Sequence, residues 1–228
     1  MKIIFPILSL LSAALLSYAL YEALVVAPTD LMQGDVYRII YYHVPSAWTA
    51  FLLFSINFVA SIVYLISRNP KADMHALTAA EMGVVFLTVN LVTGPIWARP
   101  VWGIWWTWDW RLTSTLVMWL IYVSYLMLRR FSSGETPMIA AALGIFGALC
   151  VPFVYFSIWF FRTQHPQPVI GGGGSMDPRM LHVLLVNWLA FLCFGGLVYW
   201  SRFRLEYLRR AMDEAHAMQS LAEPRGAR

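Results

Sequence analysis

The chain has 228 residues, of which 60% are hydrophobic and only 12% are charged, and its formal net charge is +4. A soluble domain of this length carries roughly 25% charged residues, so too little polar surface remains for a particle surrounded by water. The composition predicts a single all-α integral membrane domain over residues 1–228, and the scattering of basic residues among apolar runs indicates membrane lipid, not nucleic acid, as the surroundings.

Six apolar runs are long enough to cross a hydrocarbon core of about 30 Å. They cover residues 3–26, 46–66, 78–98, 112–128, 138–161 and 180–200. The first run is too long for a signal peptide and lacks a small-x-small cleavage site, so we interpret it as a membrane helix. Pro45 precedes the second run, where a missing N–H has no cost. We expect residues 201–228 to be a cytoplasmic extension of the last helix with a frayed end.

The distribution of basic residues predicts the orientation of these six spans. The side that holds both termini carries 11 of the 16 basic residues, which places the termini in the cytoplasm. Loops 27–45, 99–111 and 162–179 then face outward. That side is the periplasm in a bacterium or the intermembrane space in a mitochondrion.

Tryptophan is concentrated in the second outer loop. Six of the eleven tryptophans lie between residues 97 and 110: Trp97, Trp102, Trp105, Trp106, Trp108 and Trp110. An interfacial aromatic belt explains one or two tryptophans per helix end, but not six in fourteen residues. If residues 102–110 form a short interfacial helix, Trp102, Trp106 and Trp110 recur at i, i+4 and i+8, with Trp105 and Asp109 in the same arc. This pattern predicts an aromatic shelf for a large, flat ligand such as a porphyrin.

Two arginines bracket this shelf. Arg99 and Arg111 could pair with the propionates of a porphyrin, because guanidinium groups bind carboxylates well. Each is interpreted equally well as an arginine that reaches from a helix end to the interface.

Histidines flank the shelf in sequence. His43 lies in the first outer loop and His165 in the third, and imidazole is a common ligand of metals and of haem iron. His182 is a weaker candidate on the same side, whereas His75 and His216 lie on the opposite side. The chain contains no CxxCH, so covalent c-type haem attachment is not indicated. For Asn90, within a span, an interhelical hydrogen bond is the simplest explanation.

The segment Trp102–Ser114 closely resembles the WWD signature of haem-handling membrane proteins of cytochrome c biogenesis. The six-helix length, the segment Tyr37–Pro45 and the Thr163-Gln164-His165 ending of the fifth span single out the CcmC family. The resemblance covers nearly the whole chain, is carried most specifically by the WWD loop 97–114, and weakens in the first helix and the tail.

The resemblance implies a protein of the bacterial inner membrane that holds haem b at the outer face and delivers it to the haem chaperone CcmE. It implies His43 and His165 as axial ligands of the iron. The loop bearing Trp102, Trp105, Trp106, Trp108, Asp109 and Trp110 would cradle the ring. The small subunit CcmD and the ATP-binding cassette subunits CcmA and CcmB are implied partners. Pro166 and the Gly171–Gly174 run depart from the family pattern, so His182 remains an alternative second ligand.

Delivery requires no bond-making active site, so we expect no enzyme, and a role in covalent attachment of haem to the chaperone is left open. Two alternatives are a b-type electron carrier and a membrane transporter subunit without its own haem site. Because ligation needs neutral imidazole, haem retention should weaken as the pH falls through the histidine range, around 6.5.

Overall fold

The computed structural model describes residues 4–132, 136–168 and 176–222. Over these ranges it contains six helical segments that are long and apolar enough to cross a membrane, which confirms the predicted all-α, six-span architecture. The helices are α1 (Ile4–Tyr21), α2 (Ile40–Ser67), α3 (Pro70–Trp102), α4 (Trp110–Phe131), α5 (Thr136–Ala148), α6 (Cys150–Phe160) and α7 (Pro178–Ala222). A π-helical turn (η1, Glu22–Val26) extends α1, and a 3-10 turn (η2, Asp35–Ile39) leads into α2.

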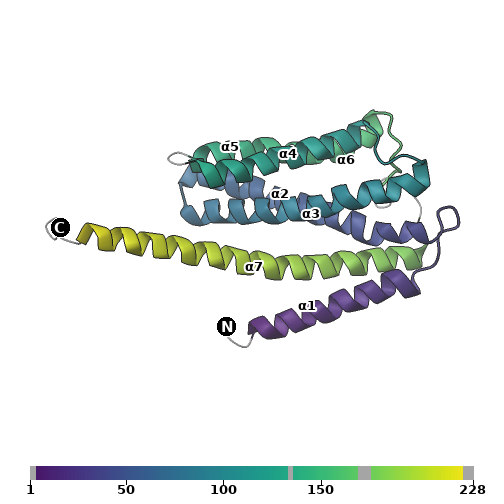
Figure 1. Cartoon of the computed structure of the whole chain (residues 1–228), viewed down its shortest axis with the longest axis horizontal. Helices are drawn as coiled ribbons and strands as arrows, with labels where there is room; N and C mark the ends of the chain where they lie inside the picture. The colour runs from purple at the N-terminus through teal and green to yellow at the C-terminus, as the bar shows by residue number, and fades with distance from the viewer. Residues whose placement is uncertain (1–3, 133–135, 169–175, 223–228) are drawn as a thin grey trace.

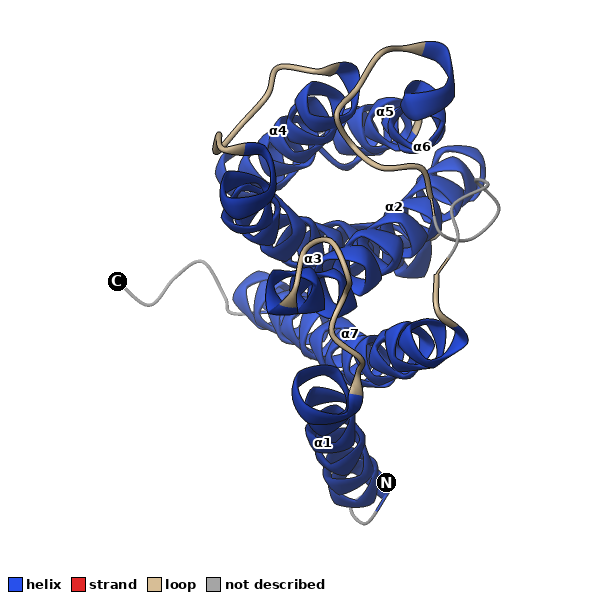
Figure 2. Ribbon diagram, turned by 90° about the vertical axis from the view of Figure 1, so that its right-hand side faces the viewer, coloured by secondary structure: helices blue, strands red, loops and turns tan. Residues whose placement is uncertain are grey.

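The helices form a four-segment group with two helices outside it. Helices α2 and α3 make the most extensive pair, and α4 and the α5–α6 segment pack against them (Figure 2). Helix α7 packs along α2 and α3, and α1 packs mainly on α7 (Figure 1). The start of α1 and the end of α7 lie at the same end of the bundle, opposite the loop between α3 and α4 (Figure 1).

The fifth span is interrupted at Leu149, between α5 and α6. Pro152 explains the break, because proline has no N–H to donate to the carbonyl four residues earlier and its ring collides with that carbonyl. The carbonyl in question belongs to Ala148, the last residue of α5. The fifth span, predicted over 138–161, is present as one apolar segment from Thr136 to Phe160, and it consists of two short helices in series.

The second span begins earlier than predicted. The turn η2 runs directly into α2 at Ile40, so Pro45 lies inside the helix and not before it. His43 is therefore a helical residue one turn into α2, and its predicted loop position is wrong. The helix continues through Pro45 at the loss of one backbone hydrogen bond near its beginning.

The core of the four-segment group is built around stacked aromatic rings. Phe54 of α2 and Tyr122 of α4 stack with centroids 3.8 Å apart and an interplanar angle of 9°. Gly83 of α3 faces the Phe54 ring, leaving no room there for a Cβ. The Tyr122 hydroxyl lies 3.1 Å from the Gly144 carbonyl and 3.3 Å from Asn57 Oδ1, so its polar end is satisfied within the apolar core.

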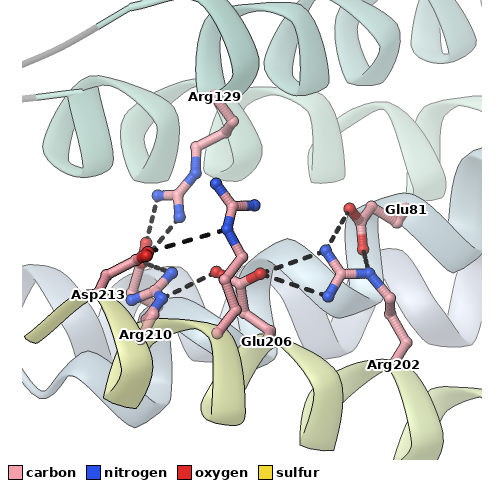
Figure 3. A network of polar contacts seen from close by, with 8 residues as sticks. Glu81, Arg129, Arg202, Glu206, Arg210 and Asp213 are labelled. Atoms are coloured by element: carbon pink, nitrogen blue, oxygen red, sulfur yellow. Dashed lines mark hydrogen bonds and ion pairs between the residues drawn. The ribbon is translucent and has the colours of Figure 1, made fainter. Parts of the chain in front are cut away.

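A network of ion pairs ties α7 to α3 and α4 at the end of the bundle opposite the α3–α4 loop (Figure 3). Asp73 is buried and accepts from Arg129 of α4 at 2.5 and 2.8 Å and from Arg210 of α7 at 2.8 Å. Glu206 joins Arg210 to Arg202, which lies 2.7 Å from Glu81. With 45 residues, α7 is about 67 Å long, so it extends well beyond a hydrocarbon core of about 30 Å. This agrees with the predicted helical continuation of the last span as far as Ala222.

Candidate functional site

A cavity at the α3–α4 loop end of the bundle brings together residues that are far apart in the sequence. It holds about 970 Å³ of empty space, part of it open to the surroundings. Helices α2, α3, α4 and α6 line it, together with the loop between η1 and η2 and the loops that follow α3 and α6. Its polar lining consists of Gln33, His43, Asn90, Arg111, Thr115, Tyr155 and His165, together with Trp48, Trp97, Trp102 and Trp106.

His43 is held by contacts with α3. Its Nδ1 lies 3.0 Å from Thr93 Oγ1, and the Asn90 side-chain amide donates to its backbone carbonyl at 3.1 Å. Trp97 packs against the ring edge to face, with centroids 5.7 Å apart, and donates its own indole N–H to Gln33 Oε1 at 2.8 Å. The His43 side chain is half-buried. Contacts with Thr93, Asn90 and Trp97 hold it in place.

His165 lies in the loop after α6 and is anchored to the beginning of α4. The Thr163 hydroxyl donates to Asp109 Oδ2 at 2.8 Å and accepts from the His165 backbone N–H at 3.1 Å. Asp109 is also the N-cap of α4, because its Oδ1 accepts from the Leu112 N–H at 2.9 Å. One carboxylate thus fixes both a helix beginning and the position of the His165 backbone.

The surroundings of His165 keep its ring neutral. Burial, followed by the nearby Arg111 guanidinium, lowers the pKa of His165 from 6.5 to about 3. A neutral imidazole retains one unprotonated nitrogen, which is the form that binds metals.

The two imidazoles are close neighbours across the cavity. Their centroids are 6.5 Å apart, and their planes differ by 31°. The centroid of an imidazole lies about 3.2 Å from a metal ion bound at about 2.0 Å from one of its nitrogens, so two rings on opposite sides of one ion would be separated by about 6.4 Å. The observed separation fits a single ion between the rings.

The tryptophan segment does not form the predicted short helix. Helix α3 ends at Trp102 because Gly103 adopts φ +77°, and residues 104–109 form a loop before α4 begins at Trp110. Trp97, Trp102 and Trp106 line the cavity. Trp105, Trp108 and Trp110 are exposed and do not line it, and Trp110 stacks instead on Phe161 with centroids 4.5 Å apart.

The two bracketing arginines also differ. Arg111 lines the cavity, and its guanidinium lies 3.5 Å from the Tyr155 carbonyl. Arg99 is exposed, donates to the Gly103 carbonyl at the end of α3 and is not a lining residue. Of these two arginines, Arg111 is the one placed to meet an anionic group inside the cavity.

Comparison with known proteins decides the family. The model of the family described as "Heme exporter protein C" (CcmC) matches residues 1–218. The chain belongs to the CcmC family. Heme exporter protein C of Bradyrhizobium diazoefficiens is 35% identical over 95% of this chain and 84% of its own length. Heme exporter protein C of Escherichia coli K12 is 32% identical over 87% and 82%. A ccmC-like mitochondrial protein of cytochrome c biosynthesis from Marchantia polymorpha is 34% identical over 81% and 80%.

Membership of the CcmC family makes this chain a multi-pass membrane protein of haem export in cytochrome c maturation. Its cavity suits the cargo that the family name states. The buried Trp106 indole N–H has no hydrogen-bond partner in the part of the chain that the structure describes, so a ligand oxygen could accept from it. The mostly apolar lining suits a macrocycle, and Arg111 suits a carboxylate.

Among the residues of this CcmC-family site that were not predicted from the sequence, three lie against His43: Asn90, Thr93 and Gly94. The expected interhelical hydrogen bond of Asn90 is confirmed, but its partner is His43. Their spacing with Trp97, at i, i+3, i+4 and i+7, was the available signal, since it places all four on one helical face. His182 is exposed on α7 and does not line the cavity, and the Gly171–Gly174 run lies outside the described residues.

Proposed function

We propose that this chain holds haem b between His43 and His165 and delivers it to a haem chaperone of the CcmE kind. The observation that carries the proposal is the pair of imidazoles, with ring centroids 6.5 Å apart, that line the same cavity as several tryptophans. Bound haem would supply an iron centre that imidazole nitrogen can ligate. His43 and His165 would hold the iron, Arg111 would hold a propionate, and Trp97, Trp102 and Trp106 would exclude water from the ring.

The exposed tryptophans have a separate part in this proposal. Trp105 and Trp108 are 59% and 78% exposed, beside the cavity-lining Trp106. Large exposed aromatic side chains are typical of surfaces that bind another protein. In the proposal they receive the chaperone where the haem edge is accessible, and subunits of the CcmA, CcmB and CcmD kinds complete the export complex.

Orientation follows from charge. Four basic residues in the second half of α7, Arg202, Arg204, Arg209 and Arg210, and the Arg129–Arg130 pair at the end of α4 lie toward the end opposite the cavity. Positively charged flanks favour the cytoplasm. The proposal therefore places the cavity at the periplasmic face of the bacterial inner membrane and both termini in the cytoplasm.

The test is a haem titration of the detergent-purified protein, followed by absorption and by quantification of bound haem. We expect the wild type to bind one haem. His43→Ala and His165→Ala should each reduce affinity by at least tenfold, because a ligand bond is lost. His182→Ala is the matched control, and it should bind like the wild type because this exposed histidine lies outside the cavity.

Two results would overturn the proposal. One is a wild-type protein that takes up no haem when haem is supplied. The other is a His182→Ala variant that loses haem while His165→Ala keeps it, which would assign the second ligand to α7.

A further inference from the structure

One face of α3 forms a seat for His43. Asn90, Thr93, Gly94 and Trp97 follow one another at i, i+3, i+4 and i+7 and so lie on the same side of the helix. Each of them contacts His43, or would contact it with one added atom: a Cβ on Gly94 would lie 3.3 Å from His43 Cε1. Three side chains of this face contact His43, and the missing side chain of Gly94 leaves room for the ring.

The hydroxyl of Thr93 determines which nitrogen of His43 carries the proton. A threonine hydroxyl has one proton to donate and lone pairs to accept. That proton has a backbone acceptor in its own helix, the Val89 carbonyl at 2.8 Å, and a carbonyl can only accept. Thr93 Oγ1 is then the acceptor in its 3.0 Å contact with His43 Nδ1, so Nδ1 carries the hydrogen.

Asn90 does not compete for the second ring nitrogen. Its Nδ2 is 3.3 Å from His43 Nδ1 and 3.1 Å from Nε2. An atom almost equidistant from both nitrogens cannot lie along the in-plane lone pair of either, because a position in the ring plane between them would collide with Cε1. The amide therefore lies over the ring face and donates to the His43 carbonyl, and the Nε2 lone pair stays free.

His165 has the same protonation pattern by a different route. Its Nδ1 lies 3.0 Å from the carbonyl oxygen of Pro166. Because a carbonyl cannot donate, Nδ1 of His165 must carry the hydrogen, and its Nε2 is unprotonated. Both histidines that line the cavity thus have Nε2 as the free nitrogen.

We propose that Thr93 is a positioning residue that fixes the Nδ1-protonated tautomer of His43 and thereby presents Nε2 to the haem iron. The inference rests on the proposed haem-binding function and adds the residue that prepares its ligand in advance. Hydrogen bonds from the outer nitrogen of a ligating histidine orient the ring and raise its basicity, and their loss typically lowers metal affinity by 10- to 100-fold.

The first test needs no haem. The ¹⁵N spectrum of the detergent-solubilised full chain, labelled at histidine, distinguishes protonated from unprotonated ring nitrogens, and His43→Gln identifies the His43 signals. We expect Nδ1–H with a bare Nε2 in the wild type and in Thr93→Ser, and a mixture of tautomers in Thr93→Val. A wild-type His43 protonated at Nε2, or an unchanged Thr93→Val, would overturn the inference.

The second test uses haem as the probe. Thr93→Val should lower haem affinity about tenfold and raise the reduction potential of the bound haem, because His43 becomes a weaker donor, while Thr93→Ser keeps wild-type values. Thr88→Val is the matched control. Thr88 is also on α3 and accepts from Trp119 Nε1 at 2.8 Å, but it lies outside the cavity, so its loss should leave the His43 signals and the potential unchanged.

The outcomes separate the two proposals. If Thr93→Ser behaves like Thr93→Val, the hydroxyl is not the cause and the inference fails. If the wild type binds no haem, the proposed function fails, but the ¹⁵N spectra still decide whether Thr93 sets the tautomer.

Discussion

The space for the His43 ring depends on the absence of a side chain at Gly94. A Cβ there would lie 3.3 Å from His43 Cε1, closer than ordinary van der Waals contact, so the ring would have to move by a few tenths of an ångström. Because metal ligation is sensitive to small displacements, Gly94→Ala should weaken haem binding several-fold without preventing folding. A haem titration measures the change.

The control for this substitution is Gly196→Ala. Gly196 is also helical, but an added Cβ there meets nothing within 4 Å. Replacing a helical glycine by alanine typically stabilises by about 1 kcal/mol, so this variant should fold at least as well and bind haem normally. Equal haem affinity in both alanine variants would show that the position of the His43 ring does not depend on the missing side chain of Gly94.

For single residues, the sequence predicts which side chains can take part in binding better than it predicts which side chains touch one another. His43, His165 and Arg111 were predicted from residue type and loop position, and all three line the cavity. The contributions of Thr93 and Gly94 depend on how α3 is rotated against α2. No local pattern determines that rotation, because it follows from packing of the whole bundle.

The loop between α3 and α4 is held by capping interactions at both ends. Gly103 ends α3 with a positive φ, and Asp109 begins α4. Asp109→Asn should keep one oxygen for the cap but place an NH₂ group where Thr163 now donates. Since an amide nitrogen cannot accept that hydrogen bond, the loop 161–168 should loosen while α4 remains intact.

Hydrogen–deuterium exchange measures this directly. We expect faster exchange in residues 161–168 of Asp109→Asn and unchanged exchange in the first turn of α4. Thr163→Val, which removes the other partner of the same bond, should have the same effect, and combining the two substitutions should add little. Fully additive effects would show that Asp109 and Thr163 act separately.

Element boundaries were predicted less well than element number. The predicted helix over residues 102–110 is wrong. The sequence contains signals against it, namely a glycine after Trp102 that can end one helix and an aspartate before the apolar run of α4 that can begin another. The tryptophan spacing indicates a helix across this segment, but Gly103 ends α3 and Asp109 begins α4. Likewise, Pro152 signalled the break at Leu149, but hydropathy is continuous across it.

The ends of the whole molecule are chemically different. His43, His165 and the cavity-lining tryptophans lie at one end, and the Asp73–Arg129–Arg210 group connects α3, α4 and α7 at the other. Asp73→Asn leaves two arginines without their shared anion, and loss of one partner of a buried pair typically costs about 3–5 kcal/mol. We expect a matching fall in the free energy of unfolding in detergent.

The matched control is Asp213→Asn, which affects an exposed pair with Arg209 at 4.0 Å. Such pairs contribute about 0–1 kcal/mol. Haem affinity of folded Asp73→Asn should equal that of the wild type, because the network and the cavity lie at opposite ends. A small effect of Asp73→Asn, no larger than that of the control, would show that the network does not hold α7 in place.

Six spans follow from hydropathy alone, because a bilayer requires runs of about 20 apolar residues. The pairing of Glu81 with Arg202 and of Asp73 with Arg210 does not follow in this way. These residues are more than 100 positions apart, and only the packing of α7 along α3 brings them together.

The most direct test of the account is rescue of the ligand-deleted protein by free imidazole. The absorption spectrum of the haem-loaded protein should be low-spin in the wild type and should change in His43→Gly and His165→Gly. Added imidazole should restore the low-spin spectrum in each, because it can occupy the space that the side chain leaves. A low-spin wild-type spectrum that persists unchanged in both glycine variants would show that the iron is held by other residues.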